Sequence, residues 1–158
     1  MAKLPRMITP GKIYFVTCRT SMGRALLTPS KTTNELIGGA LGRALHKYKP
    51  ELFNYVFLSD HFHLLARPTS DNFSDFMAFL QREISRRVGK AHGWSGGIFG
   101  TRFSAIEVLD DEAAEARFEY ILSHGVKENL VAKPEDWPGV TGADQLLSGQ
   151  TPEYRWFD

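Results

Sequence analysis

Two histidines stand one residue apart in the segment SDHFHLLARP, residues 59–68. In a β-strand, side chains at positions i and i+2 point to the same face of the sheet. His61 and His63 would therefore lie side by side, while Phe62 and Leu64 face a core on the other side. Paired imidazoles can bind a divalent metal ion. A pair of hydrogen-bonded histidines on a half-buried strand is the alternative, and this motif alone leaves both interpretations open.

A tyrosine and a third histidine follow in DEAAEARFEYILSH, residues 111–124, which begins with acidic residues as a helix N-terminus favours. Tyr120 and His124 are four residues apart and would lie one helical turn from each other. If this helix crosses the sheet near His61 and His63, three imidazoles and a phenol meet. A metal ion held by three histidines can polarise a phosphate oxygen, and tyrosine can then act as a nucleophile. The combination suggests phosphodiester cleavage through a covalent phosphotyrosine, although Tyr120 taken alone is better explained as an ordinary helix tyrosine half-packed on the sheet.

The elements that must position these residues follow from periodicity and turn signals. Strands are expected over 12–19, 52–58, 61–67 and 103–108, and helices over 32–49, 72–90 and 111–124. Thr32 and Glu35 form a capping-box pattern at the start of the first helix. The order β-α-β-β-α-β predicts an α+β fold, a ferredoxin-like antiparallel sheet with helices on one face. An additional C-terminal helix carries Tyr120.

Composition and length bound the class of protein. The chain has 158 residues, 42% hydrophobic and 23% charged, which is typical of one soluble globular domain. We expect a single domain over 1–158, with a turn-rich tail over 133–158 that Trp137, Tyr154 and Trp156 anchor to the body. The lone Cys18 excludes an internal disulfide, and no apolar run is long enough to span a membrane. The sequence is therefore expected to be cytoplasmic, with no membrane partner.

Basic residues are unevenly distributed. Residues 1–50 carry nine lysines and arginines but only one acid, Glu35, and a second basic cluster lies in QREISRRVGK, residues 81–90. Such blocks are commonly solvated faces, but they also fit a surface that binds a polyanion. Charge alone does not decide between the two.

Four segments together resemble the REP-associated tyrosine transposases, relatives of the single-tyrosine transposases of the insertion-sequence-200 type. PGKIYFVTCRT resembles the family's opening strand, and His61-Phe62-His63 in NYVFLSDHFHLLARP resembles its HUH signature. GGIFGTRFSAIEV resembles its Phe-x-x-Arg-Phe segment, and YILSHGVKENLVAKPEDWPG its tyrosine helix. The resemblance runs over residues 5–140.

The resemblance implies a metal-dependent DNA transposase, an endonuclease that cleaves and rejoins single-stranded or hairpin DNA. Residue by residue, Tyr120 matches the nucleophile and gives a 5′-phosphotyrosine, while His61 and His63 match the metal-binding pair. His124 stands where the family supplies its third metal ligand, usually an amide. The implied cofactor is Mn²⁺ or Mg²⁺, and three nitrogen ligands would favour Mn²⁺, Ni²⁺ or Zn²⁺ over Mg²⁺. Some relatives exchange the tyrosine helix between two subunits, so a homodimer is one implied assembly.

Contacts with DNA are expected at three arginines. Arg102, in the FGTRF segment, is a candidate for binding the DNA backbone, with bracing of the loop as the alternative. Arg86 and Arg87 belong to the basic cluster over 81–90 and are further candidates. Trp94 and Phe99 in the glycine-rich loop could stack on unpaired bases, although packing in the core is the favoured role.

Two departures from the family's pattern keep other functions open. Phe15 replaces the histidine that is usual in the opening strand, and His124-Gly125 replaces an Asn-Pro pair. A catalytically degenerate protein of the same fold that binds single-stranded or hairpin DNA is therefore the main alternative. A hydrolase of the histidine-triad kind is disfavoured, because Leu65 stands where its third alternating histidine would be.

Overall fold

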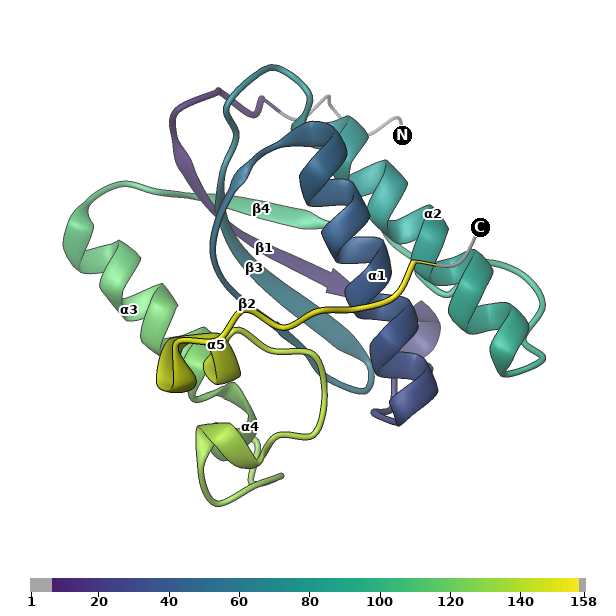
Figure 1. Cartoon of the computed structure of the whole chain (residues 1–158). Helices are drawn as coiled ribbons and strands as arrows, with labels where there is room; N and C mark the ends of the chain where they lie inside the picture. Colours follow the sequence, from purple (N-terminus) through teal and green to yellow (C-terminus); the bar gives the residue numbers. More distant parts are fainter. Residues whose placement is uncertain (1–6, 157–158) are drawn as a thin grey trace.

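A computed structural model of the chain describes residues 7–156, which form a four-stranded antiparallel sheet and helices on both of its faces (Figure 1). The strands are β1 (Ile13–Arg19), β2 (Glu51–Phe57), β3 (His61–Arg67) and β4 (Ser104–Val108), in the spatial order β2-β3-β1-β4. The helices are α1 (Lys31–Tyr48), α2 (Phe73–Ala91), α3 (Asp111–Leu122), α4 (His124–Lys127) and α5 (Ala143–Ser148). The predicted α+β, ferredoxin-like fold is confirmed. Within residues 7–156, no helix combines the length and the apolar character needed to cross a membrane.

The sheet separates two clusters of buried side chains. α1 and α2 pack on one face, against the alternate strand residues Val16, Phe62 and Leu64. α3 lies over the opposite face, as Figure 1 shows, where Phe15 and Leu65 pack with Ile121. Because alternate residues of a strand point to opposite faces, the apolar residues of β3 fill both clusters and its histidines lie on the α3 face.

Two details of the predicted elements are wrong. The first helix begins at Lys31, and its cap is Ser30, whose side-chain oxygen accepts a hydrogen bond from the Thr33 amide at 3.0 Å. Thr32 and Glu35 therefore do not form a capping box. The helix expected over 111–124 is two elements: α3 ends at Leu122, and His124 begins the short α4 after Ser123.

The C-terminal segment after α5 crosses α1, as the yellow ribbon in Figure 1 shows, and two glycines of that helix admit it. A Cβ atom at Gly38 would overlap the ring of Tyr154, and one at Gly39 would lie 2.5 Å from the carbonyl oxygen of Arg155. The glycines that weaken α1 as a helix thus let the chain approach its surface closely.

We expect alanine substitutions at two glycines of α1 to change the free energy of unfolding in opposite directions. Gly42→Ala meets no atom within 4 Å and should stabilise the protein by up to about 1 kcal/mol through the better helix propensity of alanine. Gly38→Ala must displace Tyr154 and should destabilise the protein by about 1–3 kcal/mol. Urea unfolding measures both. An equal gain in stability from the two variants would show that the segment does not pack on α1.

Candidate active site

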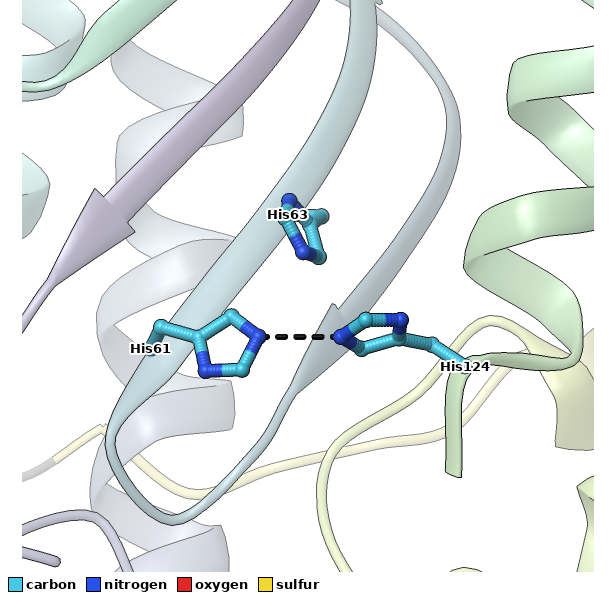
Figure 2. Close-up of side chains that lie close together, drawn as sticks. All are labelled: His61, His63 and His124. Carbon is cyan, nitrogen blue, oxygen red and sulfur yellow. Dashed lines mark hydrogen bonds between the residues drawn. The ribbon is translucent and has the colours of Figure 1, made fainter. Parts of the chain in front are cut away.

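Three histidines meet on the α3 face of the sheet. His61 and His63 project from β3, and His124 reaches them from the segment that follows α3 (Figure 2). Their side chains are buried, with exposed fractions of 7%, 3% and 2%. One ring nitrogen from each lies within 4.8 Å of the others. The three predicted metal ligands are therefore brought together, although His124 lies outside the helix that was expected to carry it.

The hydrogen bonds of two rings determine which nitrogen faces the centre of the cluster. Asp60 Oδ1 lies 2.6 Å from His61 Nδ1 and accepts its proton, so His61 Nε2 keeps a lone pair. His124 Nε2 lies 2.9 Å from His61 Nε2 and donates to it, as the dashed line in Figure 2 marks. On His63, the Thr17 hydroxyl is 3.0 Å from Nδ1 and leaves Nε2 directed at the site.

The residues fit a divalent cation. Among the described residues, His63 Nε2 is buried beside the other two imidazoles and has no hydrogen-bond partner, which is costly unless a ligand compensates. Two nitrogens bound to one ion at about 2.1 Å lie about 3 Å or more apart, close to the 2.9 Å between His61 and His124. Asp60 and Thr17 hold the outer nitrogens, as partners of metal-binding histidines commonly do.

Burial keeps two of these imidazoles neutral. The pKa of His63 is lowered to about 3 by burial, and the neighbouring His124 and His61 add to the effect. Burial also lowers the pKa of His124, with a further contribution from His61. Near neutral pH, both rings therefore offer an uncharged nitrogen, the form that binds a metal ion.

Tyr120 lies beside the cluster within the same chain. The centroid of its ring is 4.8 Å from that of His124 and 5.6 Å from that of His63. Tyr120, His61 and His124 line one cleft of about 370 Å³, together with Arg19, Asp60 and Glu128. The ammonium of Lys127 lies 4.9 Å from the centroid of the tyrosine ring. The phenol, two of the imidazoles and Arg19 thus share one cleft that is open to solvent, and Lys127 lies beside the phenol ring.

Phe15, one of the two departures from the family's pattern, packs at the base of the site. Its ring stacks on His63 at 5.0 Å and meets the edge of Tyr120 at 5.9 Å. The guanidinium of Arg117 lies over the Phe15 ring, 4.3 Å from its centroid. Phe15 therefore joins the strand to the tyrosine helix by packing, in a position where it offers no ligand atom.

Two segments distant in the sequence hold α3 and α4 against the sheet. Asn54, buried at an irregularity in β2, donates a hydrogen bond of 3.1 Å to the carbonyl oxygen of Phe118 in α3. Trp137 donates from its indole nitrogen to the carbonyl oxygen of Phe57 at 2.9 Å, and its ring lies against Gly125, next to His124. The Asp-Trp-Pro segment thereby supports the third histidine.

The arginines proposed to bind DNA lie in two places. Arg102 is exposed and comes two residues before β4, whose first residue, Ser104, pairs with Thr17 beside the histidines. Arg86 and Arg87 lie on α2, across the sheet from the histidines, and both bind the buried carboxylate of Glu83.

Three residues that support the site, Asp60, Thr17 and Asn54, were not predicted from the sequence. Asp60 is adjacent to His61, but Thr17 could be found only from the pairing of β1 with β3, which sets it opposite His63.

Known proteins resemble this chain in sequence and in structure. No family model matches the sequence. A protein of Haemophilus influenzae named "Putative REP-associated tyrosine transposase" is 26% identical over 149 residues, which cover 87% of this chain and 84% of that protein. The structure of a REP-associated tyrosine transposase bound to a REP hairpin has a TM-score of 0.74, with 22% identity, and covers 100% of this chain and 93% of its own. A "putative transposase" from Deinococcus radiodurans has a TM-score of 0.52 and 18% identity, over 82% of this chain and 98% of its own. The resemblance that the sequence indicates is confirmed.

Proposed function

We propose that this homologue of REP-associated tyrosine transposases is a metal-dependent DNA strand transferase that uses Tyr120 as its nucleophile. One observation carries the proposal: Tyr120 lies beside three buried histidines in a single chain, and Tyr120, His61 and His124 line a cleft that is open to solvent. A phenol next to a cation site suits phosphodiester cleavage through a phosphotyrosine, because the cation can polarise the phosphate that the phenol attacks.

Each residue of the cleft then has a chemical role. His61, His63 and His124 bind the divalent cation, which when bound polarises a phosphate oxygen. Tyr120 Oη forms a bond to phosphorus, the bond from phosphorus to the 3′ oxygen breaks, and the phenolic proton ends on that oxygen as a free 3′-OH. The 5′-phosphate stays on Tyr120 until a 3′-OH attacks it and rejoins the strand. Arg19 and Lys127 lie where they can bind the phosphates.

The substrate of this proposal is single-stranded or hairpin DNA. The related transposase whose structure matches is bound to a REP hairpin, which supports the extension to this chain. Arg102, Arg86 and Arg87 remain predicted contacts with the DNA backbone. A cytoplasmic location and a homodimer also remain predictions. Because one chain brings Tyr120 to the histidines, an exchange of helices between subunits is not required to complete the site.

We expect the metal site to prefer Mn²⁺ over Mg²⁺. Its three ligand atoms are imidazole nitrogens, and Mg²⁺ is instead a cation that prefers oxygen ligands. Calorimetric titration of the purified protein with each ion should show tighter binding of Mn²⁺. Binding of Mg²⁺ that is at least as tight would contradict the proposed three-nitrogen site.

The proposal is tested by trapping the covalent intermediate. The protein is incubated with a labelled hairpin oligonucleotide and Mn²⁺, and the products are separated on a denaturing gel containing SDS. We expect a labelled band at the mass of the protein plus DNA, which EDTA abolishes. DNA that is bound under native conditions but forms no adduct with Mn²⁺ would favour the alternative, a DNA-binding protein without catalysis, which the departures at Phe15 and His124 motivate.

A further inference from the structure

A second hollow lies across the sheet from the histidines, where α1, α2 and the C-terminal segment meet. It has a volume of about 520 Å³ and is lined by Arg43, His46 and Lys47 of α1, Phe79 of α2 and Trp156. The C-terminal segment reaches it by crossing α1 at Gly38 and Gly39. We call this hollow the α1–α2 groove.

Two aromatic rings stand in the α1–α2 groove. Phe79 and Trp156 are nearly parallel, with an interplanar angle of 19° and centroids 6.5 Å apart. The guanidinium of Arg87 lies 3.8 Å from the centroid of the indole. Arg87 is itself fixed by Glu83, 3.0 Å away, and only 10% of its side chain is exposed. The indole is therefore held on a rigid support.

The surroundings of the rings are positive. Arg43 lies 5.7 Å from the Trp156 ring, and Lys47 and Arg82 lie 5.0 and 5.4 Å from the Phe79 ring. The side chain of Arg82 is 63% exposed. Between residues 79 and 87 of α2 the single acid is Glu83, and the single acid of α1 is Glu35, which does not line the groove. Cations that surround aromatic rings are the combination that binds single-stranded nucleic acid, because bases stack on the rings and phosphates bind the cations.

We propose that the α1–α2 groove binds an unpaired segment of the DNA substrate, with a base stacked on Trp156 and phosphates on Arg43, Lys47 and Arg82. The inference rests on the proposed function and extends it, because the groove and the histidines lie on opposite faces of the sheet. The DNA segment in the groove is therefore different from the one that Tyr120 cleaves.

The test uses tryptophan fluorescence of the full-length protein in EDTA, so that no strand is cleaved. The probe is an oligothymidylate of about 20 nucleotides, longer than one typical binding site. We expect the probe to quench the wild-type fluorescence, and Trp156→Phe to remove most of that quenching. Trp94→Phe distinguishes the groove from the glycine-rich loop, where Trp94 lies beside another cation, Arg24, and is the alternative tryptophan on which bases could stack. If the bases stack on Trp156, the probe should still quench the fluorescence of Trp94→Phe.

A second pair of variants tests the cations without changing the core. The double variant of Arg43→Ala with Lys47→Ala should weaken binding of the probe by about tenfold and reduce the salt dependence. Lys12→Ala is the control, because Lys12 is an exposed cation that pairs with Glu107 of β4 and does not line the groove. Wild-type affinity in the double variant, or quenching that depends on Trp94 instead of Trp156, would overturn the inference. Adduct formation by the wild-type protein is a separate result, so failure here leaves the proposed strand transfer standing.

Discussion

Tyr120→Phe is expected to abolish the covalent adduct between protein and DNA, with a loss of at least about a thousandfold in its rate of formation. The substitution removes the oxygen that attacks phosphorus and keeps the ring that packs between His124 and Phe15. The histidine cluster should therefore still bind a metal ion, and the DNA should still bind. The measurement is the rate at which the SDS-resistant band appears in Mn²⁺.

The matched control for this variant is Tyr48→Phe, since Tyr48 lies on α1, across the sheet from the cluster. It should form the adduct at the wild-type rate. Because the Tyr120 side chain is half-buried and lines an open cleft, Tyr120→Phe should change the free energy of unfolding by about 0.5 kcal/mol or less. An adduct formed by Tyr120→Phe at the wild-type rate would place the nucleophile elsewhere in the chain.

The shared face of His61 and His63 could be predicted because strand periodicity is a local property of the sequence. Every second residue of β3 faces the same side of the sheet. Phe62 and Leu64 pack in the core under α1 and α2, so His61 and His63 face the opposite side. The hydrophobic stripe of α2 was predictable for the same reason. Local patterns therefore gave the elements and the two faces of the sheet.

The end of α3 could not be predicted from the same patterns. Residues 121–127 contain no proline, and the first residue after Tyr120 that typically ends a helix is Gly125. The helix ends three residues earlier, where the Ser123 hydroxyl donates to the carbonyl oxygen of Glu119 at 2.7 Å, and Trp137 lies against Gly125 from 12 residues further along. A side chain that bonds to its own helix competes with continued helical pairing. The approach of His124 to His61 therefore depends on tertiary contacts that no local period encodes.

The hydrogen-bond partners of His61 and His63 show a second limit of prediction from the sequence. Thr17 lies 46 residues before His63 in the sequence. Only the antiparallel alignment of β1 with β3 sets the two opposite each other. Asp60 could have been suspected, since it precedes His61 directly, but a loop carboxylate next to a strand can equally point to solvent. The hydrogen-bond network thus specifies which ring nitrogen faces the site, and the sequence does not.

His63→Ala is expected to weaken Mn²⁺ binding by more than about a hundredfold. His63 is 3% exposed, and its Nε2 atom is directed at the other two imidazoles without a partner among the described residues. Loss of an outer partner alone typically weakens metal binding by tenfold to a hundredfold, and loss of a ligand should weaken it more. Asp60→Asn should accordingly weaken binding by about tenfold, since it removes the charge that orients His61. Calorimetric titration with Mn²⁺ measures both.

His46→Ala tests whether Mn²⁺ binding depends on the three clustered histidines or on any histidine of the protein. His46 is exposed on α1, on the opposite face of the sheet, so its loss should leave Mn²⁺ affinity unchanged. Since imidazoles on a surface also bind transition metals weakly, the order of effects is the informative result: His63→Ala largest, Asp60→Asn intermediate, His46→Ala none. Equal Mn²⁺ affinities of His63→Ala and the wild type would mean that His63 Nε2 does not bind the ion. The cation site proposed beside Tyr120 would then be wrong.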